Sequence, residues 1–531
     1  MIVNFTQSYF LRRAVKLFGN KIGVVDGPFR FKYREFDERI SRLSNALIDM
    51  GIKPGDRVAV IESNSHYLLE ALYGVMYIGA VLVTINVRLF PSEISYILND
   101  SGAKVLIVHE EYFPLIEGFK DELKYVERII MISDIKIPKP FEGDNYENIL
   151  ENASPIKPHE AEVDENALAQ LFYTSGTTGN PKGVMLSQRH IYGNAIACII
   201  AAQLTDADNF LHLIPIFHVN GWGTPQGVTC MGGRHVLLRQ FDPEDIFKLI
   251  EKEGITKFFG VGTMINILMN HQSINKYKFK SLKLVIIGGA PATPNMIERV
   301  EKTFGCICHA GYGMTEAGPF LTASIPKDHL KDQPDEDRWG RLAKTGNETV
   351  GVELRVLGED GKEVLNNGQQ IGEIVVRSNN VMLGYWNLPE EAKNSFTEDG
   401  WFRTGDMATI DQEGYISIVD RKKDIIISGG ENISSIEVER AILAHPSVLE
   451  AAVIGIPDEK WGEVPKAMIV LKPGERLTEN DLIQYCQKHL SRFKIPKSFD
   501  FVGSLPKSGT SKILKRELRE KYWKGLEKRV H

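Results

Sequence analysis

Apolar positions in the first part of the chain follow two periods, one typical of a helix and one typical of a buried strand. Within residues 31–50 they have the spacing of one helix face, and Gly51 and Pro54 end this helix. Residues 67–78 form a second helical stretch that is almost wholly apolar. Short apolar runs predict strands at 57–61, 80–85 and 104–109. Because strands alternate with helices, we expect a largely parallel α/β sheet.

The alternation returns in the middle of the chain after a long polar segment. Residues 117–158 are polar and in places rich in proline, and we interpret them as a surface connection. Beyond them, apolar runs predict strands at 168–172, 210–216 and 282–287, and helices at 188–203 and about 295–304. A chain of 531 residues exceeds one ordinary core, so we expect roughly two to four domains or subdomains.

The last third of the chain begins with a pattern in which strands predominate. Alternating runs flank Asp360-Gly361, a hairpin signal, and with strands at 372–377 and 414–419 they predict a small antiparallel subdomain. A polar break at 420–424 predicts a boundary between domains at 1–422 and 423–531. The second domain is expected to be a compact α/β module, with helices and strands at 436–444, 448–456, 467–471 and 479–490. We interpret the basic stretch 515–529 as a solvated helix.

Composition excludes several classes of protein. Hydrophobic residues make up 43% and charged residues 25% of the chain, which is typical of a globular protein, and the net charge of −6 gives no case for nucleic acid as a partner. The five cysteines are few and scattered, which favours a reducing compartment over a disulfide scaffold. Cys306 and Cys308 alternate with Ile307 as in a buried strand and lack a second pair of zinc ligands. No apolar run is long enough for a membrane span, and we predict a cytoplasmic protein.

The strongest candidate for chemistry is the loop YTSGTTGNPKGV (173–184), which follows the apolar run 168–172. Its glycines let backbone N–H groups converge, its hydroxyl side chains add donors, and Lys182 adds a positive charge, so the loop suits a polyphosphate. The P-loop of nucleotide hydrolases would need glycine at Pro181 and serine or threonine at Gly183, and neither is present. A flexible linker is the other alternative, and the apolar runs on both sides argue against it.

This loop resembles the phosphate-loop signature of the adenylate-forming (ANL) superfamily, which includes acyl-CoA synthetases, peptide-synthetase adenylation domains and luciferases. Further stretches resemble the family's motifs in the same order, namely PIFHVNGW (215–222), GYGMTE (311–316), WFRTGD (401–406), DRKKDIIISGGENIS (420–434) and LPKSGTSKILK (505–515). The resemblance covers nearly the whole chain. It implies a large N-terminal domain of two α/β subdomains plus a small barrel-like sheet, and a small mobile C-terminal α/β domain.

The resemblance also implies which residues bind ATP or AMP. Tyr312 would stack on adenine, Asp406 would accept both ribose hydroxyls, and Thr315 would reach the α-phosphate. Glu316 would hold Mg²⁺. The implied set is Thr174, Ser175, Gly176, Thr177, Thr178, Lys182, Gly289, Ala290, Tyr312, Gly313, Thr315, Glu316, Asp406, Arg421 and Lys512. Of these, Lys512, Glu316, Thr174 and Lys182 are implied to be catalytic through charge stabilisation.

Other motif positions are implied to form the acyl pocket, the hinge and the CoA-facing turn. The implied acyl pocket comprises His218, Trp222, Gly288 and Gly313, the hinge is Lys423, and the CoA-facing turn comprises Ser428, Gly429, Gly430 and Glu431. Taken alone, a histidine or tryptophan such as His218 or Trp222 is more often a packed residue than a ligand contact, and the surrounding motif favours the functional role. Ser511 stands where the family has glycine, and the matching flanks keep Lys512 assigned.

The implied activity is that of an acyl-CoA synthetase with ATP, CoA and a carboxylic acid as its partners and Mg²⁺ as cofactor. The acid, which we expect to be a fatty acid, would react with ATP to form acyl-AMP and pyrophosphate. Reaction of acyl-AMP with CoA would then give acyl-CoA and AMP. The alternatives are a ligase for short hydroxy-, branched or aryl acids, a luciferase, a peptide-synthetase adenylation domain and a silent nucleotide-binding module. An adenylation domain of that kind uses an Asp near the position of His218, and none is present there. A homodimer is an open alternative to a monomer.

Overall fold

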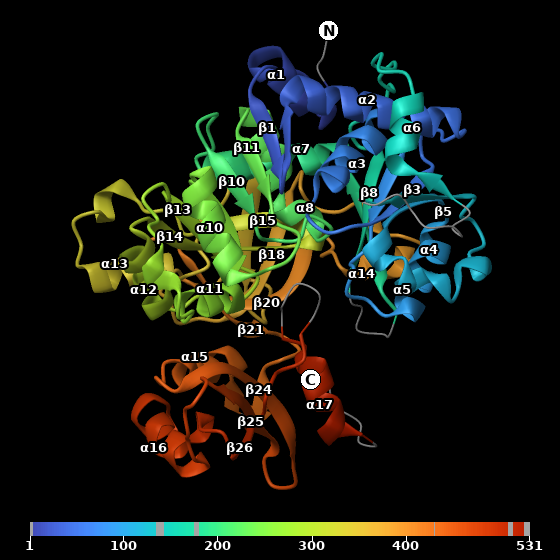
Figure 1. The fold of residues 1–531 in the computed structure, drawn as a ribbon. Coiled ribbons are helices and arrows are strands. Elements are labelled where there is room, and N and C mark those ends of the chain that lie inside the picture. Colours follow the sequence, from blue (N-terminus) through green and yellow to red (C-terminus); the bar gives the residue numbers. More distant parts are fainter. Residues whose placement is uncertain (1–3, 134–142, 175–179, 430, 508–512, 525–531) are drawn as a thin grey trace.

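The computed structural model describes residues 4–133, 143–174, 180–429, 431–507 and 513–524 (Figure 1). Figure 1 shows a larger part that contains the elements up to β21, and below it a smaller part that contains the remaining C-terminal elements. In the described part of the chain the strands form four sheets, which we name the β8, β10, β20 and β25 sheets. The mixed α/β architecture with a small C-terminal part confirms the predicted fold class.

The β8 sheet contains the two strands, β8 and β9, that flank the predicted phosphate loop. Its strands from β8 to β7 are parallel, whereas β9 and β19 are antiparallel to their neighbours. In spatial order they are β19 (Gly384–Tyr385), β9 (Lys182–Ser187), β8 (Leu168–Thr174), β4 (Val81–Thr84), β3 (Arg57–Ile61), β5 (Ala103–His109), β6 (Arg128–Ile132) and β7 (Asp144–Asn145).

The β10 sheet is parallel through its centre and antiparallel at both edges. In spatial order its strands are β16 (Asn347–Glu348), β15 (Gly318–Ala323), β14 (Ile307–Met314), β13 (Leu284–Gly288), β12 (Lys257–Val261), β10 (Asn209–His212), β11 (Arg234–Leu237), β1 (Ile22–Asp26) and β2 (Phe29–Lys32). On β14 the predicted alternation is present, because Cys308 is buried while Ile307 is exposed.

Two smaller sheets follow in the sequence. The antiparallel β20 sheet contains β17 (Val352–Leu357), β18 (Gly372–Ser378), β20 (Phe402–Ile410) and β21 (Ile416–Arg421). The β25 sheet lies in the smaller part and contains β23 (Glu431–Ile433), β22 (Ile426–Ser428), β25 (Gly462–Leu471), β24 (Val448–Asp458) and β26 (Ser498–Phe501). The chain between β21 and β22 is therefore four residues long, and a domain boundary within it stays a prediction.

The α-helices surround these sheets and lie between them (Figure 1). They are α1 (Ser8–Phe18), α2 (Tyr33–Asp49), α3 (His66–Tyr77), α4 (Pro91–Ser101), α5 (Pro114–Glu117), α6 (Tyr146–Asn152), α7 (Gln188–Ala201), α8 (Val219–Trp222), α9 (Thr224–Met231), α10 (Pro243–Glu253), α11 (Gly262–Met269), α12 (Pro294–Phe304), α13 (Asp335–Leu342), α14 (Pro389–Asn394), α15 (Ser435–Leu443), α16 (Glu479–His489) and α17 (Lys515–Trp523). None of the described helices has the length and apolarity needed to cross a bilayer.

Helix α3 shows why the two large sheets form one core. Every residue of α3 is buried, as expected for a helix that is apolar on all sides. Its side chains share a hydrophobic cluster with Val58 of β3 in the β8 sheet and with Val24 of β1 and Leu237 of β11 in the β10 sheet. Burial between the two sheets therefore fixes their relative position.

Two expectations from the sequence are wrong. The segment 117–158 is not a plain surface connection, because β6, β7 and α6 lie within it. The apolar run of β6 is short, and parallel pairing with β5 along five residues is what makes it a strand. The predicted hairpin around Asp360-Gly361 also does not form two full strands, because β17 pairs with β18 and only Leu357 and Glu363 form a bridge.

The buried Glu62 is expected to make stability depend on pH. It follows β3, and its Oε1 lies 3.1 Å from Nη1 of Arg239, which follows β11 in the other sheet. Burial raises the pKa of Glu62 from 4.5 to about 7. Between these values the folded state holds a proton that the unfolded chain has lost, so this group lowers stability as the pH rises, by about 3 kcal/mol over the window.

Glu62→Gln should therefore flatten the dependence of the unfolding free energy on pH between 4.5 and 7, as measured by urea titrations at each pH. Glu111→Gln is the matched control, because Glu111 also pairs with Arg239 but is 41% exposed. An equal pH slope in wild type and Glu62→Gln would contradict the assignment.

Candidate active site

The arms of the phosphate loop lie on adjacent strands of the β8 sheet. Thr174 ends β8 and pairs in register with Lys182, which begins β9. Ser175, Gly176, Thr177 and Thr178 lie outside the described residues, and so does Lys512. The Nζ of Lys182 forms an ion pair with Glu391 of α14 and lies 5.7 Å from the ring centre of Tyr385 on β19. A phosphate bound by Lys182 would have to displace Glu391.

Glu316 lies close to Tyr385, the residue that Lys182 also approaches. It follows β14, is partly exposed, and its Oε1 accepts a hydrogen bond of 3.5 Å from the hydroxyl of Tyr385. Burial raises the pKa of Glu316 above its usual value. The adjacent Thr315 is buried. Tyr385 thus joins Lys182 to Glu316, and sequence reasoning missed it because a two-residue strand has no periodicity to detect.

Asp406 is the centre of a second cluster. It lies on β20, is 4% exposed, and its Oδ2 accepts a hydrogen bond of 2.6 Å from the hydroxyl of Tyr312 on β14. Its Oδ1 lies 3.3 Å from Nε of Arg421 on β21. Arg421 is also within electrostatic reach of Glu316, so the two clusters adjoin. Strands of two sheets therefore bring together the four residues Tyr312, Glu316, Asp406 and Arg421.

The glycine turn after β13 lies directly against Trp222. A Cβ atom at Gly288 would come within 2.9 Å of the Trp222 indole, and one at Gly289, where φ is +74°, within 3.1 Å of Val261. Ala290 follows these glycines and is exposed. Trp222 is 9% exposed and its ring centre lies 6.2 Å from that of Phe259. Only glycine at position 288 leaves room for this placement of the indole.

The remaining acyl-side residues also lie where backbone approaches closely. A Cβ at Gly313 would meet the backbone oxygen of Pro319 at 2.3 Å, so no side chain fits there without a shift of the backbone. His218 precedes α8 and is half-buried. Its carbonyl accepts a hydrogen bond of 3.0 Å from the amide of Gly221, one residue before Trp222.

The predicted hinge and CoA-facing residues lie on the C-terminal side of β21. The carbonyl of Lys423 accepts a hydrogen bond of 3.2 Å from Arg519 of α17. Ser428 and Glu431 pair across β22 and β23, with Gly429 between them at φ +61°. Gly430 lies outside the described residues. Trp461 covers Gly429, where a Cβ would lie 2.6 Å from its ring, and is 44% exposed. Sequence reasoning missed this aromatic neighbour.

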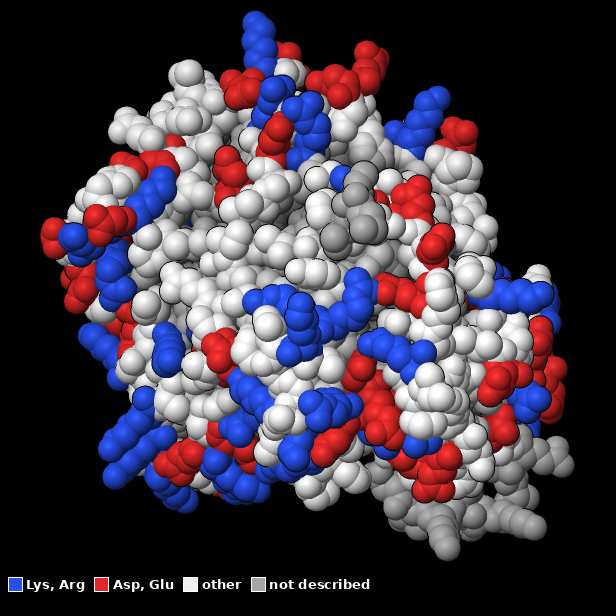
Figure 2. Space-filling model, turned by 90° about the horizontal axis from the view of Figure 1, so that it is seen from above, with Lys and Arg blue, Asp and Glu red and all other residues white. Residues whose placement is uncertain are grey.

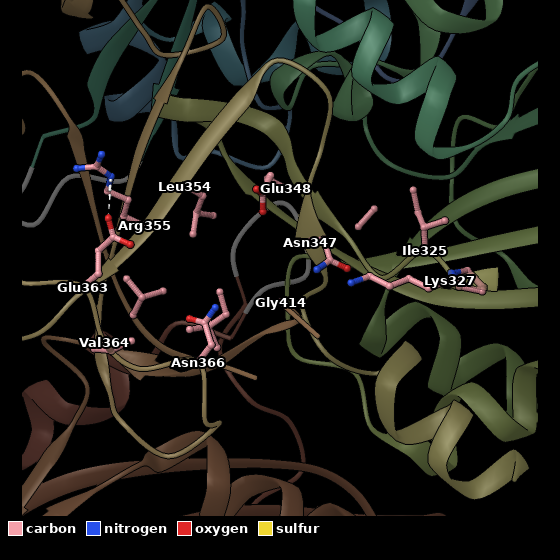
Figure 3. A pocket seen from close by; sticks show the side chains of 14 residues that line it. Ile325, Lys327, Asn347, Glu348, Leu354, Arg355, Glu363, Val364, Asn366 and Gly414 are labelled. Atoms are coloured by element: carbon pink, nitrogen blue, oxygen red, sulfur yellow. Dashed lines mark ion pairs between the residues drawn. The ribbon is translucent and has the colours of Figure 1, made fainter. Parts of the chain in front are cut away.

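One pocket lies away from the predicted site. A pocket of about 600 Å³ opens between β15, β16, β17 and β20, and Figure 3 shows Lys327, Asn347, Glu348, Arg355, Glu363 and Asn366 around it. Its cations are paired, since Arg355 lies 3.2 Å from Glu363 and Lys327 lies 3.8 Å from Glu413. None of the predicted site residues lines it.

Figure 2 shows side chains of both charges, Lys and Arg as well as Asp and Glu, on the face seen from above. No cluster of three or more His, Cys, Asp or Glu residues suited to a metal occurs within the described ranges.

Comparison with known proteins gives matches along almost the whole chain. Residues 11–386 match the family model described as AMP-binding enzyme, and residues 437–512 match the AMP-binding enzyme C-terminal domain. The long-chain-fatty-acid–CoA ligase of Thermus thermophilus is 38% identical over 522 residues, covering 97% of this chain and 95% of that protein. The 4-hydroxybutyrate–CoA ligase 2 of Metallosphaera sedula is 36% identical, covering 97% and 94%.

Solved structures agree with the fold. The anthranilate CoA ligase AuaEII in complex with anthranoyl-AMP superposes with a TM-score of 0.89 at 26% identity, covering 98% of both chains. ATP-bound MatB from Rhodopseudomonas palustris superposes with a TM-score of 0.86 at 28% identity, covering 98% of this chain and 99% of that one.

Proposed function

Because the chain belongs to the AMP-binding enzyme family, we propose which of its residues carry out the acid–CoA ligase reaction and which acid they take. The chain is an AMP-forming acyl-CoA synthetase. A carboxylate oxygen attacks the α-phosphorus of ATP and pyrophosphate leaves. The thiol sulfur of CoA then attacks the acyl carbon, AMP leaves, and the thiol proton goes to solvent.

The cluster of Tyr312, Asp406 and Arg421 is the observation that carries the proposal for the nucleotide. An aromatic face next to a buried carboxylate suits adenine and ribose, because each carboxylate oxygen has lone pairs beyond those used by Tyr312 and Arg421. Thr315 is next to this cluster, and Gly288, Gly289 and Ala290 form the turn that we assign to the adenine and the acyl group. Thr174, residues 175–178 and Lys182 would hold the phosphates.

Glu316 has the chemistry of a Mg²⁺ ligand. Mg²⁺ prefers hard oxygen donors and is usually held by one or two carboxylates together with substrate phosphates. A partly buried carboxylate beside the phosphate loop fits this need, and the hydrogen bond from Tyr385 orients it. Bound there, the ion would neutralise phosphate charge. With that ion bound to Glu316, the positive charges of Lys182 and Lys512 would further lower the repulsion between the two anionic reactants.

We propose a fatty acid as substrate, with a short hydroxy acid as the second candidate. The apolar surroundings of Trp222, which packs against Gly288 and Phe259, support an acyl chain on this side of the site. The 36% identical relative from Metallosphaera sedula is named for 4-hydroxybutyrate, and the indole fills space that a longer chain would need. The name of that relative and the space filled by the indole are the two observations that favour the short hydroxy acid.

Truncating Trp222 should distinguish a gate from an ordinary core residue. We expect Trp222→Ala to raise activity on long acyl chains relative to short ones, because the space over Gly288 becomes available to the chain. The measurement is kcat/KM over a series of acids of increasing length. An unchanged chain-length profile, with stability lower by about 3–5 kcal/mol, would mean that Trp222 only packs the core. Trp401→Ala, at a buried tryptophan immediately before β20, is the control.

A panel of carboxylates tests the proposed function directly. Pyrophosphate release is measured for each acid with and without CoA, and thioester formation is measured in parallel. We expect acid-dependent pyrophosphate release and CoA-dependent turnover with at least one fatty or hydroxy acid. Release that depends on no acid in the panel would contradict the proposed substrate class.

The second half-reaction is assigned to the C-terminal part. We propose that Ser428, Gly429, Gly430 and Glu431 face CoA after rotation about Lys423, and that Lys512 faces ATP before it. We place the enzyme in the cytoplasm, which its five buried and unpaired cysteines support. A homodimer stays a prediction, and sedimentation of the purified chain would measure it.

A further inference from the structure

The turn that carries Trp222 has an unusual backbone. Five consecutive residues from Val219 to Gly223 have positive φ, with values of 43°, 53°, 53°, 65° and 81°. Left-handed conformation costs free energy at every residue that has a Cβ, and it is normally visited by single residues. Val219, Asn220 and Trp222 all carry this cost. Neighbouring groups must therefore hold the turn in place.

Polar side chains of the β8 sheet reach across to the segment that leads into this turn. Asn64, which follows β3, donates to the carbonyls of His212 and Ile214 at 2.9 and 3.1 Å and accepts from the amide of Ile216 at 2.7 Å. Thr84 of β4 donates to the carbonyl of Phe217 at 3.0 Å. These contacts fix the approach to the turn and leave the turn itself to be held by others.

Gln170 on β8 contacts a side chain of the turn, whose carbonyls at Gly221 and Trp222 also accept hydrogen bonds from Thr224 and Asn194 at 3.0 and 3.5 Å. Its Nε2 donates to Oδ1 of Asn220 at 3.0 Å, and Nδ2 of Asn220 donates back to its Oε1 at 2.6 Å. Gln170 is fully buried and Asn220 is 5% exposed. A reciprocal amide pair at this depth is strongly orienting, because breaking it leaves two buried amides unsatisfied. Figure 1 shows α8 between β8 and β15, where this contact is made.

The geometry points to Gln170 and Asn220 as a positioning pair for the acyl substrate. By holding Asn220 in the left-handed region, Gln170 fixes the direction of the next residues, and so places the Trp222 indole over Gly288. Gln170 also lies four residues before Thr174 on the strand that enters the phosphate loop. We infer that this pair links the phosphate-loop strand to the acyl side of the site. The inference about the backbone of the turn does not depend on the proposed function, and only its expected effect on enzyme kinetics rests on that function.

The first test measures the turn itself and needs no substrate. Hydrogen exchange of the 219–223 peptide, measured by mass spectrometry, should be about tenfold or more faster in Gln170→Leu, because the orphaned Asn220 no longer holds the turn. The double variant Gln170→Leu/Asn220→Gly should restore most of the protection, because glycine adopts positive φ without a Cβ clash and needs no partner. Asn220→Val should exchange faster than Asn220→Gly, because a β-branched residue disfavours this backbone most.

The second test measures selectivity for the acid. We expect Gln170→Leu to raise KM for the acid by about tenfold or more, with kcat and KM for ATP changed by less than about threefold. Adding Asn220→Gly to this variant should restore KM for the acid. Asn209→Leu is the control, because Asn209 also donates two hydrogen bonds, which are partly buried, to the carbonyls of Glu253 and Gly254. It should lower stability without moving KM for the acid or exchange at 219–223.

The outcomes separate this inference from the proposed function. Unchanged exchange in Gln170→Leu, or exchange and KM effects equal to those of Asn209→Leu, would overturn the positioning role. Should Gln170→Leu not fold, the comparison of Asn220→Val with Asn220→Gly decides instead, and equal exchange in those two variants overturns it. Failure of the acid panel with wild-type enzyme would remove the proposed function while leaving the exchange result intact.

Discussion

Lys512→Ala is expected to lose acyl-adenylate formation by about 10²–10³-fold while largely retaining thioester formation from acyl-AMP that is supplied ready-made. The reason is electrostatic, because a positive charge that faces ATP only before domain rotation acts on the first half-reaction alone. Pyrophosphate release reports the first step, and acyl-CoA formation from synthetic acyl-AMP reports the second.

The structure indicates that this substitution will not unfold the segment around it. Lys507 pairs across an antiparallel bridge with Ile513, and its Nζ lies 2.5 Å from Glu450. Just beyond, Lys515 pairs with Glu439 at 2.7 Å. Both ends of the loop are therefore fixed independently of position 512. Lys507→Ala serves as the control, and we expect it to lower stability with little change in the ratio of the two half-reactions.

Equal loss of both steps in Lys512→Ala, at an unchanged melting temperature, would show that this lysine serves both orientations. A loss restricted to the second step would contradict the assignment outright.

Lys423→Pro is expected to separate the half-reactions in the opposite sense. Proline fixes φ near roughly −65° and restricts the preceding residue as well, so rotation between β21 and β22 should be hindered. We expect acyl-AMP to form while its transfer to CoA slows by roughly tenfold or more, because the C-terminal part cannot reach its second position. The rate of each half-reaction is measured separately by single-turnover kinetics.

Lys423 lies in a small turn that contacts α17. The amide of Asp424 donates to the carbonyl of Arg421 at 2.8 Å, and Arg519 of α17 lies 2.5 Å from Asp424. Lys423→Ala is the control, since it removes the charge and keeps the backbone freedom. Gly430→Leu should give a similar kinetic split by blocking access to the acyl-AMP. If Lys423→Pro slows neither step, or slows both equally, the proposed rotation about this residue is contradicted.

Local pattern determined much of the fold from the sequence alone. Helical spacing in residues 31–50 predicted α2, and short apolar runs predicted β3, β5 and β13 close to their observed bounds. The helical spacing and the short apolar runs are local patterns, so they can be recognised in the sequence before any pairing partner is known. Motif resemblance likewise identified Tyr312, Glu316, Asp406 and Arg421, which the structure brings together.

Contacts between distant parts of the chain were decided only by the tertiary structure. Lys182 and Glu391 are separated by 209 positions, and Tyr385 reaches Glu316 across 69. Strand β6 lies inside a segment that is polar overall, and parallel pairing with β5 is what makes it a strand.

The turn at Val219–Trp222 illustrates the physical reason. Asn220, Gly221 and Gly223 tolerate left-handed backbone, but the local preference of Val219 and Trp222 opposes it. The conformation is stabilised by Gln170, which is 50 positions away in the chain and adjacent only after the two large sheets have packed together. A sequence pattern records the preferences of neighbouring residues, whereas this site depends on a hydrogen bond that exists only in the folded core.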